Sequence, residues 1–264
     1  MIQIALQDVV NVYSGPEGRL WELVMGEQVH IGGFQSSMAL ADRAGIQAGS
    51  EGVDLCCCSG AGMRFLARWR NVARMTGVDA TEIMIALGRH RCLNEGFDSR
   101  IRFVTADVTA SGLPDASADF VWGEDAWCYV VDKPRLTAEA ARLVKSGGMV
   151  AFTDWVIGEP GMSDADLDRL LAFMKFPNME TVAGWRGLLE QSDLTVEVAE
   201  PTDRFAPCVD LYLNMLGTQL TYDALNIIGN NVELFQRMAG EMQFMQKLAH
   251  QGRIVQGIFV ARKK

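Results

Sequence analysis

Residues 53–62, with the sequence Val-Asp-Leu-Cys-Cys-Cys-Ser-Gly-Ala-Gly, decide the fold of this chain. The first residues suit a short buried strand, the next are small, and a helical pattern starts at about residue 63. Glycines let the backbone approach a ligand closely, and a helix N-terminus presents unpaired N–H groups. This order is typical of a nucleotide-type ligand site, although many ordinary strand-to-helix turns of α/β proteins share it.

The next predicted strand supplies an acid that favours the ligand site. Residues 74–78 form a strand pattern that ends at Asp79, 25 residues after Asp54. An acid at this place can accept hydrogen bonds from both hydroxyls of a ribose. The turn lacks the G-x-G-x-x-G spacing of dinucleotide sites, and Asp54 lies inside the first strand. A dinucleotide is therefore not the expected ligand.

The pattern Asp-x-small-x-small-x-Gly followed by a second acid resembles the first motifs of class I S-adenosylmethionine-dependent methyltransferases. This resemblance implies S-adenosylmethionine as the cofactor. Those enzymes usually carry glycine where this chain has Cys56 and Cys58, and only Gly60 matches. A cysteine in the left-handed backbone conformation costs about 1–2 kcal/mol that glycine avoids. Either both cysteines are extended here, or the loop is rebuilt.

Length and charge limit the possible partners. The 264 residues can bury a sizeable core in one or two domains. The net charge of −9 provides no basic surface for displacing phosphate counterions, which argues against a nucleic-acid partner. The sequence shows no leader-like start and no long apolar run, so we expect a cytoplasmic protein without a membrane partner.

The six cysteines do not follow a metal-binding pattern. Cys56, Cys57 and Cys58 are consecutive, so alternate side chains on a strand end point to opposite faces. Neither C-x-x-C nor H-x-x-x-H spacing occurs, and the three histidines are far apart. We expect reduced thiols and no metal.

Strands and helices alternate through the middle of the chain. Further strands are predicted at residues 101–105, 119–123, 149–154, 194–198 and 257–261. Helices are predicted at residues 37–45, 81–95, 134–144, 163–175 and 181–191, and over most of 209–250 with a break at 229–231. The alternation implies a parallel, doubly wound α/β sheet that binds ligands at the carboxyl ends of its strands. Five acids should then meet at one rim: Asp79, Asp107, Glu124, Asp125 and Asp154.

The first forty residues do not resemble the start of such a sheet. Residues 8–12 are short and apolar, residues 17–25 have helical spacing, and residues 26–34 form a glycine-rich loop with His30. From the residues alone, this arm is either a surface appendage or a lid over the cofactor.

Four longer segments resemble sarcosine/dimethylglycine N-methyltransferases and sugar O-methyltransferases of indolocarbazole biosynthesis. They are residues 21–33, 113–122, 139–148 and 178–186, so the likeness spans nearly the whole chain. It implies a Rossmann-like, seven-stranded methyltransferase sheet in a single catalytic domain. Residues 1–40 would be the N-terminal lid arm and 41–156 the cofactor-binding core, with helical substrate-cap insertions and the final strands in 157–264.

The resemblance also implies roles for individual residues. Tyr13 and His30 would close over the methionine end of the cofactor, and Gly60 with its neighbours would support that end. Asp79 would hold the ribose, and Asp107 with Val108 the adenine. The cofactor-binding residues expected from motif and resemblance together are Tyr13, His30, Asp54, Cys56, Gly60, Asp79, Asp107, Val108 and Glu124.

The chemistry expected at the rim depends on Asp154 and Tyr129. Methyl transfer from a sulfonium is an in-line displacement, in which an amine need only arrive deprotonated, whereas a hydroxyl usually needs a base. Relatives commonly have a histidine at or beside Tyr129, so a histidine base is in doubt here. We expect Asp154 and Tyr129 to be catalytic.

The acceptor site is less defined by the sequence. Aromatic side chains could form a cage for a cationic amine, or simply pack in the core and cap. Arg186 could pair with a substrate carboxylate or be a solvated surface charge. The predicted substrate-binding residues are Trp127, Trp155, Trp185 and Arg186.

We expect N-methylation of a small amine by a monomer or homodimer. The alternatives are O- or C-methylation of a secondary metabolite, or cofactor binding without transfer.

Overall fold

A single seven-stranded sheet organises the computed structural model, which describes residues 4–264. The strand order is β3-β2-β1-β4-β5-β7-β6, and β7 runs antiparallel to both of its neighbours. The strands are β1 (Glu51–Leu55), β2 (Arg74–Asp79), β3 (Ile101–Thr105), β4 (Ala118–Glu124), β5 (Val144–Ile157), β6 (Leu194–Pro201) and β7 (Ile254–Lys263). The predicted Rossmann-like methyltransferase sheet is confirmed, with the correction that it is mixed rather than wholly parallel.

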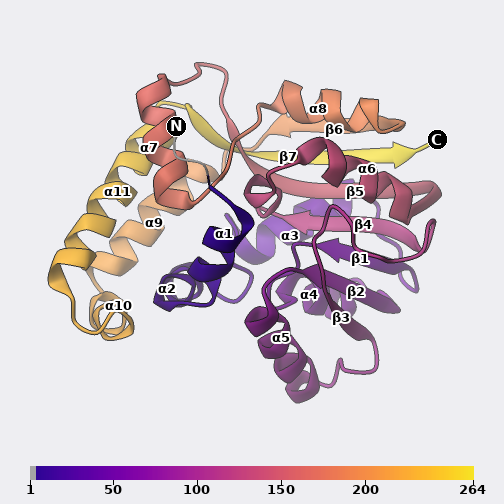
Figure 1. Cartoon of the computed structure of the whole chain (residues 1–264), viewed down its shortest axis with the longest axis horizontal. Helices are drawn as coiled ribbons and strands as arrows, with labels where there is room; N and C mark the ends of the chain where they lie inside the picture. The colour runs from indigo at the N-terminus through magenta and orange to yellow at the C-terminus, as the bar shows by residue number, and fades with distance from the viewer. Residues whose placement is uncertain (1–3) are drawn as a thin grey trace.

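Helices cover both faces of the sheet, as the alternating pattern predicted (Figure 1). One face packs on α3 (Gly33–Arg43), α4 (Ala61–Trp69) and α5 (Glu82–Glu95), and the other on α6 (Lys133–Leu143) and α8 (Val182–Gln191). Each face therefore has its own apolar core. Because α3 belongs to the first of these cores, the expected boundary between residues 40 and 41 falls inside a helix.

A third apolar cluster joins the N-terminal arm to the C-terminal helices. It includes Trp21, Leu170, Val209 and Met245. The helices of this region are α1 (Leu6–Tyr13), α2 (Pro16–Met25), α7 (Asp164–Met174), α9 (Phe205–Gly217), α10 (Thr221–Ile227) and α11 (Val232–His250). In Figure 1 they gather to one side of the sheet, with α1 and α2 in front. The arm and the C-terminal helices thus form one apolar layer next to the sheet.

Helix caps explain why several of these helices begin where they do. The side chains of Ser163, Thr181 and Asn231 accept hydrogen bonds from backbone N–H groups in the first turns of α7, α8 and α11. The predicted start at Ser163 and the break at residues 229–231 are therefore confirmed. Within residues 4–264, no helix is both long and apolar enough to cross a bilayer.

Candidate active site

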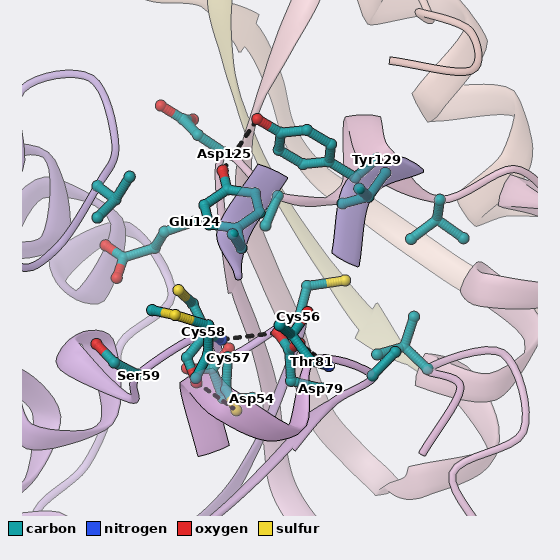
Figure 2. Close-up of a pocket in the computed structure, with 18 of the residues that line it drawn as sticks. Asp54, Cys56, Cys57, Cys58, Ser59, Asp79, Thr81, Glu124, Asp125 and Tyr129 are labelled. Atoms are coloured by element: carbon teal, nitrogen blue, oxygen red, sulfur yellow. Dashed lines mark hydrogen bonds between the residues drawn. The ribbon is translucent and has the colours of Figure 1, made fainter. Parts of the chain in front are cut away.

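A cavity opens at the carboxyl ends of β1, β2, β3 and β4, and α1 forms part of its wall. Eight of the predicted site residues line it: Tyr13, Asp54, Cys56, Asp79, Asp107, Val108, Glu124 and Tyr129. In Figure 2, Tyr129 lies across this space from the cysteine loop and Asp79. The structure thus brings together residues that are up to 116 positions apart in the sequence.

Of the two conformations expected for the cysteine loop, extended or rebuilt, the structure shows a rebuilt loop with both outer cysteines in the left-handed region. Cys56 and Cys58 have φ angles of +66° and +49°, in the left-handed region. The loop directs the N–H of Cys56 to the Val78 carbonyl oxygen at 2.9 Å and the N–H of Cys58 to Asp79 Oδ2 at 2.8 Å. Burial raises the pKa of both thiols, so they stay protonated and are poor nucleophiles. Cys56 and Cys58 therefore contribute to the site through their backbone N–H groups rather than through their thiols.

Asp79 is oriented by two backbone hydrogen bonds. Its Oδ2 accepts from the N–H of Cys58, and its Oδ1 accepts from the N–H of Thr81, both at 2.8 Å. Each carboxylate oxygen can accept a further hydrogen bond. Burial raises the pKa of Asp79, and these backbone hydrogen bonds partly offset the effect. Asp79 is therefore fixed at the end of β2 with acceptor capacity to spare.

Gly62 lines the cavity at the start of α4, where any side chain would collide with Glu124. A Cβ atom there would lie 2.6 Å from Glu124 Oε2, 3.2 Å from Trp122 Nε1 and 3.5 Å from Asp54 Oδ2. The Nε1 of Trp122 is buried and has no hydrogen-bond partner within the described chain. Burial, then the charge of Glu124, raises the pKa of Asp54. The carboxyls of Asp54 and Glu124, which line the cavity beside the bare backbone of Gly62, fit the ammonium at the amino-acid end of S-adenosylmethionine.

Tyr13 and Tyr129 connect α1 to the segment after β4. The Tyr13 hydroxyl donates to the Tyr129 hydroxyl at 2.9 Å, and the two rings meet edge to face with centroids 5.6 Å apart. Burial raises the pKa of both phenols, so both are protonated at neutral pH. This pair can donate and accept hydrogen bonds at the cavity, but it cannot serve as a ready base.

Comparison with known proteins agrees with this geometry. A family described as methyltransferase domain matches residues 53–152. A dimethylglycine N-methyltransferase of Parasynechococcus marenigrum is 31% identical over 189 residues, which is 66% of this chain and 66% of that protein. The chain belongs to the class I S-adenosylmethionine-dependent methyltransferases. Its cofactor is S-adenosylmethionine, as in the solved methyltransferase structures that hold it.

Two solved methyltransferase structures show the same fold over nearly the whole chain. One, from Galdieria sulphuraria and proposed to be a sarcosine dimethylglycine methyltransferase, has a TM-score of 0.81 at 20% identity, covering 93% of this chain and 97% of that one. Phosphoethanolamine N-methyltransferase 2 of Haemonchus contortus has a TM-score of 0.83 at 18% identity, covering 96% and 58%. This chain matches a smaller part of some other curated methyltransferases, down to 31% of the length of one of them.

His30 lies behind the wall of this methyltransferase's cavity instead of lining it. The ring is fully buried, 3.2 Å from Ser37 Oγ and 3.4 Å from Glu124 Oε1. Ser37 in turn donates to Glu124 Oε1 at 2.6 Å. His30 therefore contacts Glu124 from behind the wall, and its expected place over the methionine end of the cofactor stays a prediction. Gly60 also lies outside the lining: it is the N-cap residue before α4 with a φ of +72°, and a Cβ there would lie 2.7 Å from Phe103.

Asp154 does not face the cavity of the methyltransferase, contrary to expectation. Its side chain is fully buried, with Oδ1 accepting from the N–H of Cys128 at 3.0 Å and Oδ2 from Trp185 Nε1 at 3.1 Å. The reason is that β5 continues to Ile157 by pairing with β7, so Asp154 lies within the strand. Burial raises the pKa of Asp154 to about 7, although Lys133 lowers it. Asp154 thus positions the segment that carries Tyr129.

The predicted substrate-binding residues also lie elsewhere. Trp127 stacks on Phe152 with centroids 4.0 Å apart, and Trp185 packs in the same core cluster. Trp155 packs edge to face on Phe205 in the third cluster. Arg186 is exposed and lies 3.8 Å from Glu190, one turn along α8. None of the four lines the cavity, because the three tryptophans pack in apolar cores and Arg186 faces solvent.

Two residues that support the methyltransferase site, Gln256 and Ser37, were missed from the sequence. Gln256 Nε2 donates to the Ile31 carbonyl oxygen at 3.0 Å and to Asp125 Oδ2 at 3.0 Å, while Asp125 Oδ2 also accepts from the N–H of Ile31 at 2.8 Å. One polar side chain in the apolar run of residues 254–261 is a detectable signal for Gln256. Ser37 has no such signal, because its role depends on how α3 packs.

Proposed function

We propose that this protein transfers the methyl group of S-adenosylmethionine to the nitrogen of a small-molecule amine. The choice of nitrogen as the methylated atom rests on the side chains available at the cavity. The two tyrosines at the cavity have a raised pKa, no histidine of residues 4–264 lines it, and Asp154 is turned away. The lining carboxyls of Asp54, Asp79, Asp107 and Glu124 are those expected to hold the cofactor. A hydroxyl acceptor usually needs a base at the reacting atom, whereas a deprotonated amine already carries its lone pair. The 31% identity to a dimethylglycine N-methyltransferase supports the same choice.

The cofactor would be held by residues that already face the cavity. Asp79 would accept hydrogen bonds from the ribose hydroxyls, and Asp107 with Val108 would border the adenine. Asp54, Glu124 and the backbone of the cysteine loop would surround the amino-acid end beside Gly62. When bound, the sulfonium supplies an activated methyl group.

The protein's own contribution is alignment and exclusion of water. Tyr13 closes α1 onto Tyr129, which shields the reacting atoms and restricts the approach of the acceptor. Asp154 holds the backbone before Tyr129, so the phenol keeps its place. Tyr129 would donate or accept one hydrogen bond at the acceptor, and the amine would lose its proton to solvent.

The test uses methyl-labelled S-adenosylmethionine with a panel of amines and the corresponding alcohols. We expect label in amine products. Asp79→Ala should weaken cofactor binding by about 2–4 kcal/mol, the contribution of two charge-assisted hydrogen bonds, as measured by calorimetry. Asp98→Ala, at an exposed acid outside the cavity lining, is the matched control.

Two results would contradict the proposal. Label found only in the alcohol products would show O-methylation. Tight cofactor binding without label in any product would show a cofactor-binding protein that does not transfer methyl groups.

A further inference from the structure

Two arginines, on α4 and α5, hold the residue that directly follows the three cysteines. Arg64 Nη1 donates to the Ser59 carbonyl oxygen at 2.7 Å, and Arg91 Nη1 donates to Ser59 Oγ at 3.0 Å. Ser59 is buried and lines the cavity next to Cys58 (Figure 2). Neither arginine belongs to the lining, so both act on the cavity through Ser59.

The same two arginines form ion pairs with acids of the N-terminal arm. Arg91 Nη2 pairs with Glu22 on α2, and Arg91 Nε lies 3.8 Å from Glu27 in the turn that follows. Arg64 Nη2 pairs with Glu27 as well, while its Nε lies 2.9 Å from Glu95 of α5. A continuous link of charged contacts therefore runs from the arm, through both guanidinium groups, to the cofactor loop.

Burial makes this link stronger than an ordinary surface ion pair. The side chain of Arg64 is 5% exposed and that of Arg91 is 17% exposed, whereas that of Arg68, also on α4, is 48% exposed. An exposed pair contributes little to stability, but a buried charge that loses its partner is costly. If the arm moved away, Arg91 would lose both of its acidic partners. The ion pairs thus favour the closed position of the arm.

We propose that Arg64 and Arg91 are positioning residues that couple closure of the arm to the conformation of the cofactor loop. The acids of the arm orient the two guanidinium groups, and these orient Ser59 beside Cys58, whose N–H in turn holds Asp79. A ligand that needs the ordered loop then also favours the closed arm, and the coupling is reciprocal. Because this coupling concerns cofactor binding, it does not depend on which atom accepts the methyl group.

The first experiment measures the binding of S-adenosylhomocysteine to Arg91→Met and Arg68→Met by calorimetry. This ligand has no net charge at neutral pH, so the lost positive charge acts through local contacts and not through long-range attraction. Arg68→Met is the matched control, because Arg68 lies outside the cavity lining and pairs with Glu95, an acid of the core.

We expect Arg91→Met to weaken binding at least about 5-fold, because fewer molecules hold the binding-competent conformation. Arg68→Met should weaken it less than about 2-fold, as for most surface substitutions. Equal affinities in the two variants would overturn the proposal.

Glu22→Gln tests whether the arm takes part. Glu22 lies outside the lining and its side chain is 27% exposed, so this substitution is mild and remains informative where Arg91→Met does not fold. We expect weaker binding in Glu22→Gln. Its combination with Arg91→Met should bind no more weakly than Arg91→Met alone, because both substitutions break the same link. Wild-type affinity in Glu22→Gln, or additive losses in the double variant, would overturn the proposal.

Amide hydrogen exchange separates the coupling from a general loss of stability. Without ligand, residues 14–27 should exchange faster in Arg91→Met than in Arg68→Met, while β6 should exchange at the same rate in both variants. Unchanged exchange over residues 14–27 would confine the role of Arg91 to the loop and overturn the coupling. Faster exchange in β6 as well would show general destabilisation and would overturn it too.

Discussion

Cys56 and Cys58 have positive φ angles in the loop where related enzymes usually carry glycine. At Cys58 the left-handed bend turns the N–H toward Asp79, so the strained residue orients the side chain expected to hold the ribose. Strain of this kind persists only where the surrounding structure enforces it, often at functional sites. The identity of residue 58 is thus a compromise between backbone conformation and local packing.

Replacing Cys58 with glycine should therefore give a more stable protein than replacing it with alanine, by about 1 kcal/mol in the free energy of unfolding. Alanine keeps the Cβ atom that disfavours a φ of +49°, and glycine removes it. At a position with helical or extended backbone, the alanine variant would instead be more stable than the glycine variant. Urea denaturation of the two variants measures the difference. An alanine variant as stable as the glycine variant would show that this bend carries no strain.

At the scale of elements, α1 is the part of the wall best suited to open and close. It carries Tyr13, which meets Tyr129 through one hydrogen bond and one edge-to-face ring contact. Glycines 26, 32 and 33, all at positive φ, follow α2 and can accommodate a change of backbone conformation. A bound cofactor would fill the space beneath it and add contacts. Residues 6–34 are therefore expected to act as a lid.

Amide hydrogen exchange should slow across residues 6–34 when S-adenosylhomocysteine is added. Tyr13→Phe keeps the ring but removes the hydrogen bond to Tyr129, so the slowing should be smaller in that variant. The amides of β6, far from the cavity lining, serve as an internal reference. Unchanged exchange over residues 6–34 at saturating ligand would make the arm a fixed part of the fold.

At the scale of the whole molecule, Gln256 links the two ends of the chain. Its amide donates to the backbone of Ile31, to Ser36 and to Asp125, across 225, 220 and 131 positions of sequence. The side chain is fully buried, so water cannot replace it easily. This link holds the start of α3, the exit of β4 and the antiparallel strand β7 together beside the cavity.

Gln256→Met should lower the free energy of unfolding by about 2–4 kcal/mol, because the buried carboxylate of Asp125 and the Ile31 carbonyl both lose the hydrogen bonds that the Gln256 amide donates. Gln47→Met, at an exposed loop position, should change it by less than about 0.5 kcal/mol. Denaturant midpoints of the two variants compare the effects. Similar midpoints would indicate that the link contributes nothing to stability.

The sequence by itself determined the order of the elements and the acids at the ends of the strands. The apolar runs, the capping residues and the acids at or just after the ends of β2, β3 and β4 are local features, so Asp79, Asp107 and Glu124 could be placed at the rim without coordinates. The resemblance added Tyr13, which no local pattern indicated and which lines the cavity.

Only the tertiary structure decided which side chains face the ligand and which face the core. Asp154 was expected at the end of β5, but pairing with β7, about a hundred residues later, extends the strand to Ile157 and buries its carboxyl. Trp127 comes just after β4 and Trp185 lies on α8, yet both pack with Phe152. The physical reason is that strand length, direction and side-chain packing depend on partners distant in sequence, whereas turns, caps and strand patterns depend on near neighbours.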